Sequence, residues 1–258
     1  MTSVTSSAVR TPRIPPALVS AVIALALWQL ATTVGPFADV SIPSVVETAQ
    51  ALWAEVQNPD FYSRLWETIQ MSVLGFVIAM VIAIPVGVLI GLSRFAWRST
   101  KFTFDFFKVI PPIVIIPITI LVLGPTMQMG VFLIIFTLVF AMAIQTALGV
   151  RDADATLLET ARCYGLSSWQ QVRFIRLPAA SPFIAYGVRI SASAALVVSI
   201  VAGLIGGAPG LGRAVLLAQV GGEEARTFAL VVVLGILGIL VSRGVSFAER
   251  KFLFWIPR

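Results

Sequence analysis

The chain has 258 residues, of which 58% are hydrophobic and only 12% are charged, whereas about a quarter of the residues of a soluble domain are charged. This composition excludes an ordinary soluble domain and indicates an integral membrane protein. The net charge of +6 comes with no basic face with interleaved aromatic residues outside the apolar segments, so we expect no nucleic-acid partner.

The N-terminal region divides into a polar tail and an apolar run. Residues 1–16 are rich in Ser and Thr and carry Arg10 and Arg13, so we expect a flexible cytoplasmic tail. The apolar run 17–33 predicts a first membrane helix that is retained as an uncleaved anchor. A signal peptide is the alternative, because a basic region precedes an apolar run.

A polar connector, residues 35–70, separates this run from the next one. Apolar residues recur at helical spacing after Ser44, which predicts an amphipathic helix lying on the bilayer or on neighbouring helices. The second span is expected at 67–92. It contains Gly87 and Gly91, a GxxxG pair that permits close approach of another helix.

Four further apolar runs complete an expected set of six membrane helices. A basic loop at 93–101 precedes the third span, in which Pro111-Pro112 and Pro117 predict a kink or break. Each run is near the ~20 residues needed to cross the hydrocarbon core. We therefore predict an all-α polytopic protein, with one membrane domain over 17–250, a C-terminal tail over 251–258, and the later spans at 102–124, 129–150, 183–207 and 227–247.

The distribution of basic residues predicts the orientation. With a cytoplasmic N-terminus, the outer segments hold only Arg64, Arg213 and Arg226, and nearly all other basic residues fall in inner segments. Because Lys and Arg concentrate on the cytoplasmic side, we expect both termini and the polar loop 151–182 to be cytoplasmic.

The first half of that polar loop has the signals of a short capped helix. Asp152 or Asp154 is suited to accept hydrogen bonds from free N–H groups at the helix start. Gly165 stands where a left-handed residue would end the helix. A compact structured loop is therefore expected here instead of a linker.

The second half of the loop predicts another short helix. Ser167 and Gln170 have the Ser-x-x-Gln spacing of a capping box, which marks a helix start. Pro178 disfavours helical geometry at Leu177, so we expect the helix to stop there. The loop is thus predicted to be two short helices joined at Gly165.

Ionisable and polar residues within the spans are candidates for function, because such groups are expensive in hydrocarbon. Asp105 and Lys108 are spaced i,i+3 and are expected to pair structurally, whereas Arg189 is as compatible with a functional role as with a structural one. Most neutral polar residues should bond to their own or neighbouring helices, and a minority should line a path. The candidates for a translocation path are Thr119, Gln128, Thr137, Gln145, Ser191, Ser199 and Arg189.

Residues for chemistry are scarce in this chain. It has no histidine and one cysteine, Cys163, which excludes a Ser-His-Asp triad, a histidine-ligated zinc site and an internal disulfide bond. It also has no GxxxxGK[ST] phosphate loop. We expect no enzyme activity, cofactor or metal, and if ATP drives this protein, the ATPase is on another chain.

The polar loop resembles the EAA motif of the permease subunits of bacterial ABC importers. The pattern is Glu-Ala-Ala, three residues, Gly, nine residues, then Ile-x-Leu-Pro. Thr160 replaces the first alanine of the pattern. The matching positions, all in register, are Glu159, Thr160, Ala161, Gly165, Ile175, Leu177 and Pro178.

The resemblance extends from about 41 to 255 and is greatest to the nitrate, sulfonate and taurine branch of these permeases. One departure is Gly203, which follows Val-Ala where the branch usually has an acidic residue. The supporting stretches are Ile42-Pro43-Ser44, the segment 87–93, Ile110-Pro111-Pro112 with Pro117, the segment 187–190, Gly210-Leu211-Gly212 and Glu249-Arg250-Lys251.

The resemblance implies a type I ABC importer fold and a set of partners. Two permease subunits, identical or paralogous, would pair in the bacterial cytoplasmic membrane, two ATPase subunits would dock on their loops, and an extracytoplasmic binding protein would deliver the solute. The EAA residues would form the coupling element. Arg162, Arg173 and Arg176 would either contact the ATPase or serve orientation.

By the same resemblance the solute is expected to be a small anion, such as a sulfonate, nitrate or an aromatic carboxylate. The alternative function is an ATP-independent channel or secondary transporter with the loop as a docking platform. A coupled transporter typically has inverted repeats and an ion site at the midplane, which this chain lacks in its sequence. A membrane-embedded enzyme is a remote third possibility, because the chain has no histidine and no clustered acidic ligands.

Overall fold

The computed structural model describes residues 16–34 and 42–252, and the predicted tails lie almost wholly outside them. The described part is helical, without strands. Its elements in order are α1 (Pro16–Thr33), α2 (Val45–Gln57), α3 (Pro59–Leu92), α4 (Arg94–Val109), α5 (Pro112–Leu123), α6 (Met127–Arg151), α7 (Ala155–Cys163), α8 (Ser168–Gln171), the π-helical turn η1 (Val172–Arg176), α9 (Leu177–Gly206), α10 (Leu211–Val220) and α11 (Glu224–Phe252).

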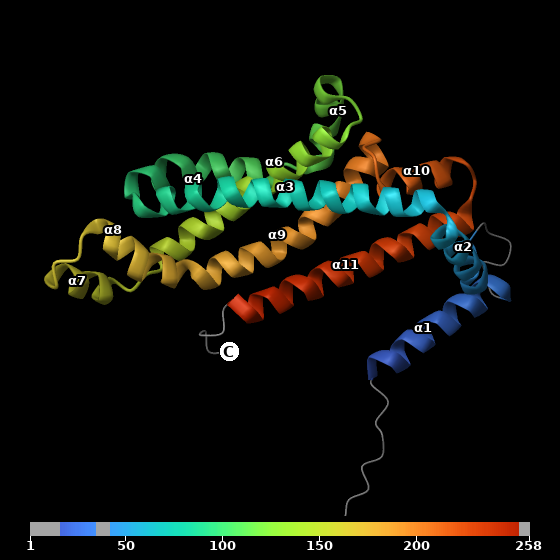
Figure 1. Cartoon of the computed structure of the whole chain (residues 1–258), viewed down its shortest axis with the longest axis horizontal. Helices are drawn as coiled ribbons and strands as arrows, with labels where there is room; N and C mark the ends of the chain where they lie inside the picture. The colour runs from blue at the N-terminus through green and yellow to red at the C-terminus, as the bar shows by residue number, and fades with distance from the viewer. Residues whose placement is uncertain (1–15, 35–41, 253–258) are drawn as a thin grey trace, which may run out of the picture.

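Helices α3, α6 and α9 form the centre of an elongated bundle, with α11 alongside α9 (Figure 1). The loop helices α7 and α8 lie at one end, here called the loop end. Helices α2 and α10 lie at the other, the α10 end. The core between α3, α6 and α9 contains fully buried small residues such as Ala79, Ala83 and Ala143. Small side chains let helix backbones approach closely in a membrane, where packing replaces the hydrophobic effect between helices.

The predicted close approach at Gly87 and Gly91 is confirmed. A Cβ added at Gly87 would lie 2.5 Å from the carbonyl oxygen of Ala143, and one at Gly91 would lie 2.9 Å from that of Ala147. Both carbonyls belong to α6. The GxxxG pair is therefore the surface on which α6 packs against α3.

Four described segments are long and apolar enough to cross a membrane: 59–92, 127–151, 168–220 and 224–249. Helices α4 and α5 are bent by 86° at their junction and pass the same test only together, as one broken span or as a re-entrant loop. The apolar stretch of α1, Val19–Thr33, is shorter. The described residues thus contain four or five spans by length and composition, and the sixth stays a prediction.

The break predicted in the third span lies at Ile110 and Pro111. A proline has no N–H to donate and pushes the residue before it out of helical geometry, and Ile110 accordingly has φ −66° and ψ 116°. The expected basic loop at 93–101 is wrong, since α4 begins at Arg94 with Ser93 as its N-cap. The hydroxyl of Ser93 accepts a hydrogen bond from the N–H of Ala96.

The predicted helix stop at Pro178 is also wrong. Leu177 is helical, with φ −68° and ψ −44°, and α8, η1 and α9 run on without a break. Pro178 is the second residue of α9 and lies inside this continuous helix, where a proline removes one backbone hydrogen bond. The N–H of Leu177 donates to the carbonyl of Val172 in the wider π-helical turn, which is how the chain absorbs the proline.

Candidate functional site

The first helix of the polar loop forms as its local signals predicted. Asp154, rather than Asp152, is the N-cap of α7, and its carboxylate accepts a hydrogen bond of 2.7 Å from the N–H of Thr156. Gly165 has φ +75°, and the N–H of Leu166 donates to the carbonyl of Ala161 at 3.0 Å. This 6→1 bond with a left-handed glycine is the Schellman ending of a helix.

The second helix begins with the predicted capping box. The N–H of Gln170 donates to the Ser167 hydroxyl at 3.3 Å, and the N–H of Ser167 donates to the side chain of Gln170 at 2.8 Å. The side chain of Gln171 also donates to the carbonyl of Leu166 at 2.9 Å. The turn between the helices is thereby bonded on both sides, so the loop is one rigid unit.

The motif residues divide between the interior and the surface of that unit. Ala161 is buried, as is Leu158 one helical turn before it. Ile175 and Leu177 are half-buried, whereas Glu159, Thr160, Gly165 and Pro178 are exposed. No Cβ-sized obstacle lies within 4 Å of Gly165, so its backbone conformation alone calls for glycine.

Large apolar side chains stand exposed on the loop, a feature that the sequence interpretation did not use. Aromatic residues within a polar segment were the signal that could have found them. They are Leu157, Tyr164, Trp169 and Phe174, each more than half exposed.

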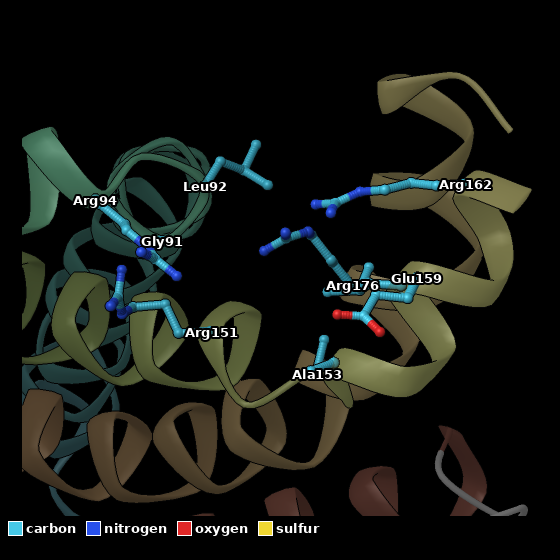
Figure 2. A pocket seen from close by; sticks show the side chains of 10 residues that line it. Gly91, Leu92, Arg94, Arg151, Ala153, Glu159, Arg162 and Arg176 are labelled. Atoms are coloured by element: carbon cyan, nitrogen blue, oxygen red, sulfur yellow. The ribbon is translucent and has the colours of Figure 1, made fainter.

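A polar pocket of about 510 Å³ lies between the loop and the ends of α3 and α6. Four of its lining residues are arginines: Arg94, Arg151, Arg162 and Arg176. Figure 2 shows Arg162 and Arg176 extending from the loop side toward the side that holds Arg94 and Arg151, with the Glu159 carboxylate also turned toward the space. Among the described residues none of these four arginines forms an ion pair within 4.0 Å.

The three arginines predicted at the ATPase contact thus separate into two groups. Arg162 and Arg176 face the pocket, whereas Arg173 lies over the ring of Phe174, with 5.7 Å from Cζ to the ring centroid. The sequence interpretation did not connect Arg94 and Arg151 with the loop. Arg94 begins α4 and Arg151 ends α6. Only the packing of α3, α4 and α6 brings their side chains to the same pocket as the loop arginines.

Several predicted path residues use their hydroxyl groups in hydrogen bonds to their own or a neighbouring helix. The hydroxyl of Thr119 is buried and donates to the Ile116 carbonyl at 2.9 Å, and Thr137 donates to Leu133 at 2.7 Å. Ser199 is buried, accepts a hydrogen bond of 2.8 Å from Ser72 and donates to its own helix.

Gln145 and Ser191 are brought together. They line a pocket of about 130 Å³ between α6 and α9 that also includes Tyr186 and Gly187. Gln128 is exposed at the start of α6, away from them. Among the predicted path residues, this pair alone shares a described cavity.

The ionisable residues predicted within the spans form ion pairs. The expected pair of Asp105 and Lys108 is confirmed, with 2.6 Å between Oδ1 and Nζ. Arg189 is half exposed and lies 3.6 Å from the Glu249 carboxylate of α11. This contact favours a structural role for Arg189 in joining α9 to α11.

The α10 end contains a buried carboxylate that the sequence did not single out. Glu55 is 5% exposed and lies 3.3 Å from Arg64 of α3 and 2.8 Å from Arg226 of α11. Nearby, the Thr68 hydroxyl accepts a hydrogen bond of 2.8 Å from the N–H of Leu211, the first residue of α10. Helices α2, α3, α10 and α11 are joined there by polar bonds.

Gly203, the departure from the branch pattern, lies at the contact between α9 and α10. A Cβ there would lie 2.8 Å from the backbone nitrogen of Arg213 and 3.0 Å from Cα of Gly212. Backbone atoms cannot rotate away as a side chain does, so a carboxylate has no room at this position. The packing of α10 against α9 therefore explains the glycine.

Residues 83–253 match the family model described as "Binding-protein-dependent transport system inner membrane component". A relative described as "Probable ABC transporter permease protein" in Brucella abortus is 30% identical, over 93% of this chain and 95% of the relative. The "Putative aliphatic sulfonates transport permease protein SsuC" of Bacillus subtilis is 28% identical over 92% and 86%. The "Nitrate import permease protein NrtB" of a Synechocystis strain is 24% identical over 94% and 90%.

Solved structures share this fold. A chain of the MetNI methionine ABC transporter, in an inward-facing conformation, superposes with a TM-score of 0.64 at 25% identity, covering 72% of this chain and 93% of that chain. A chain of an amino acid ABC transporter superposes with a TM-score of 0.63 at 18% identity, covering 75% and 94%.

Proposed function

This chain belongs to the family of binding-protein-dependent transport system inner membrane components and is an ABC transporter permease, and from that premise we propose that it forms the translocation path of an ATP-driven importer. Its partners are ATPase subunits, a second permease subunit, identical or paralogous, and an extracytoplasmic solute-binding protein. The chain lies in the bacterial cytoplasmic membrane with both termini and the loop 151–182 on the cytoplasmic side.

The rigid two-helix loop is the observation that carries this proposal. Its caps at Asp154 and Ser167 and its ending at Gly165 are satisfied by bonds within the loop. These local bonds define the shape of the loop, and it presents exposed apolar side chains such as Tyr164 and Trp169 to a partner. Exposed aromatic residues of this kind are typical of protein interfaces.

In this function the loop transmits motion. The continuous helix through α8, η1 and α9 connects the loop directly to the membrane core. Closure of the ATPase pair would move the loop as a unit and tilt α9 with it, which is a rigid-body route between outward and inward access. Glu159, Thr160, Ala161, Gly165, Ile175, Leu177 and Pro178 are the coupling residues, and Arg173 on the exposed surface contacts the ATPase.

The proposed solute is a small organic or inorganic anion, such as a sulfonate, nitrate or an aromatic carboxylate. The support comes from the printed names of relatives, an aliphatic sulfonates permease and a nitrate permease, that align over most of this chain. Gln145 and Ser191, which line the pocket between α6 and α9, are the path residues that we propose to meet the solute. Neither carries a charge that would repel an anion.

Replacement of Gly165 by valine tests the coupling role. Valine is strained at φ +75° by about 1–2 kcal/mol, but its Cβ meets no atom within 4 Å. The matched control is Gly222→Val, at φ +68° in an equally open site at the α10 end. We expect ATP-driven uptake by the reconstituted transporter to fall at least ~10-fold for Gly165→Val, a loss of about 1.4 kcal/mol of coupling, and to stay near wild type for Gly222→Val.

Equal uptake by both variants would contradict the coupling role, and uptake by vesicles that contain no ATPase subunit would contradict the importer. The solute class is tested separately, by titrating the partner binding protein with sulfonates, nitrate, aromatic carboxylates, neutral sugars and cations. Tight binding of a sugar or a cation, with no anion bound, would contradict the anion proposal and leave the importer proposal standing.

A further inference from the structure

We propose that the arginine pocket, lined by Arg94, Arg151, Arg162 and Arg176, binds a phosphate group carried by a lipid headgroup or by a soluble phosphate compound. This site is distinct from the exposed face of the loop, where Tyr164 and Trp169 stand, and from the cavity of Gln145 and Ser191. It adds a ligand to the permease that neither the transported solute nor the ATPase supplies.

The charge balance of the pocket calls for an anion. Four guanidinium groups face it from α4, the end of α6, α7 and η1, and Glu159 is the only carboxylate among its lining residues. At the α10 end, by contrast, Glu55 lies within 3.3 Å of both Arg64 and Arg226. Like charges that converge without a partner repel one another, so a bound dianion would relieve the repulsion in the arginine pocket.

Guanidinium chemistry favours phosphate over a compact anion such as chloride. The planar fork of arginine donates two parallel hydrogen bonds to two oxygens of one phosphate. Groups that approach from opposite walls, as Arg162 and Arg176 do relative to Arg94 and Arg151 (Figure 2), can bind different oxygens of the same group. The volume of about 510 Å³ lies within the range of small-molecule sites, roughly 300–1,000 Å³.

One wall of the pocket is already organised. Arg151 lies over the ring of Trp97, with 5.1 Å from Cζ to the centroid, and Lys101 lies over the same ring at 5.6 Å. This cation–π stacking limits the freedom of the Arg151 side chain before any ligand arrives. A held guanidinium loses less entropy on binding, which favours affinity.

The surroundings suit both sources of phosphate. Leu92 lines the pocket, and the neighbouring Phe95 is 80% exposed on the outside of α4, so an acyl chain could lie along an apolar surface beside the headgroup. The opposite side is the polar loop with Glu159 and Arg162, through which a soluble phosphate could enter. In either case the ligand would connect the loop to the ends of α4 and α6.

The test uses the full chain in a maltoside detergent, which carries no phosphate, and measures its midpoint of thermal unfolding. One arm adds inorganic phosphate and compares it with sodium chloride at equal ionic strength. The other arm adds phosphatidylglycerol to the detergent micelles. A ligand that binds the folded state raises the midpoint in proportion to its saturation, so a rise with phosphatidylglycerol alone identifies the lipid, and a rise with phosphate identifies the soluble source.

The variant Arg162→Gln/Arg176→Gln removes one wall of the site, and Arg94→Gln/Arg151→Gln removes the other. The matched control is Arg98→Gln/Arg243→Gln, which deletes the same charge from exposed positions of α4 and α11 outside the pocket. We expect the apparent Kd to rise at least ~10-fold in both pocket variants, since each charge-assisted hydrogen bond contributes severalfold or more, and to change less than ~2-fold in the control.

Three results would overturn the proposal. The first is no rise in the midpoint of the wild-type chain in either arm. The second is an equal loss of binding in the control and the pocket variants, which would mean that net charge alone attracts the anion. If the pocket variants bind phosphate normally but lose association with the ATPase, the arginines belong to the protein interface instead, and the proposal is wrong.

Discussion

At the α10 end of the bundle, Arg64 and Arg226 share the buried carboxylate of Glu55, whereas at the loop end four arginines line one pocket with no ion pair among the described residues. The first arrangement joins α2, α3 and α11 and gives each guanidinium group a carboxylate partner. The second leaves donors directed into open space (Figure 2). The same residue type is thus structural where a carboxylate is buried beside it and available for a ligand where none is.

The largest expected effect is at Glu55. Glu55→Gln removes the charge that compensates Arg64 and Arg226, a change that costs about 3–5 kcal/mol in a fully buried pair. Because both arginines remain nearly 30% exposed, we expect about 2–3 kcal/mol of lost stability after solvent screening. Chemical unfolding of the purified chain in detergent measures this loss.

Asp60→Asn is the matched control, since Asp60 is 72% exposed and lies 3.5 Å from the same Arg64. The free energy of unfolding of Asp60→Asn should fall by less than about 1 kcal/mol. Equal losses for the two variants would mean that burial of Glu55 does not matter, and the contrast between the two ends would fail.

Glycine should show the next contrast between the ends. Gly203→Ala at the α9–α10 contact forces a Cβ to within 2.8 Å of backbone, and overpacking of this kind costs about 1–3 kcal/mol. Gly165→Ala at the loop end meets open space at φ +75° and should cost only about 1 kcal/mol of backbone strain. The control Gly235→Ala, in open space on α11, should be near neutral in the same unfolding measurement. A stable Gly203→Ala would show that α10 is free to shift.

A smaller effect is expected from the two capping boxes, one near each end. Ser44→Ala removes the cap of α2, in which the Ser44 hydroxyl accepts a hydrogen bond of 3.2 Å from the backbone N–H of Glu47. This loss should lower the free energy of unfolding by about 1 kcal/mol. Ser167→Ala should change global unfolding less, because α8 continues into η1 and α9, while it reduces ATP-driven uptake. Unfolding and transport assays on both variants check this. A larger loss of stability for Ser167→Ala together with a larger loss of uptake for Ser44→Ala would contradict it.

The Ser44 box also has a pH dependence. Hydrogen bonds from the backbone N–H and then the hydroxyl of Ser44 hold the pKa of the Glu47 carboxyl below its usual value. The stabilisation is therefore complete above the ordinary pKa and is lost as the pH falls through the lowered one. Acid titration should bring Glu47→Gln, which lacks the titrating carboxylate, and wild type closer in stability. A stability gap that persists below the pKa of Glu47 would contradict it.

The smallest effect on stability is expected from the arginine pocket itself. Without a ligand, Arg162→Gln/Arg176→Gln removes repulsion and breaks no ion pair between described residues, so the free energy of unfolding should change by less than about 0.5 kcal/mol or rise slightly. The same unfolding assay measures it. A loss comparable to that of Glu55→Gln would show that these arginines are structural, as at the other end.

Local hydrogen bonding made part of this structure predictable. The caps of the loop at Asp154, Gly165 and Ser167 involve partners within a few residues, and so does the break at Pro111. Pro178 misled the same reasoning, because its effect depends on whether the preceding turn widens to a π-helix. Local rules of that kind describe a preference, and the neighbouring chain decides whether it is met.

The sequence by itself determined the membrane class, the capped loop, and the glycine pair of α3, since composition, short-range bonds and spacing are properties of the chain. Tertiary structure alone decided that Glu55 meets Arg226, 171 positions away, that Gly203 faces Gly212 of α10, and that Arg94 and Arg151 join the loop arginines. The physical reason is that charge pairing and close packing act over a few ångströms in space, so partners on different helices become neighbours only once those helices have packed.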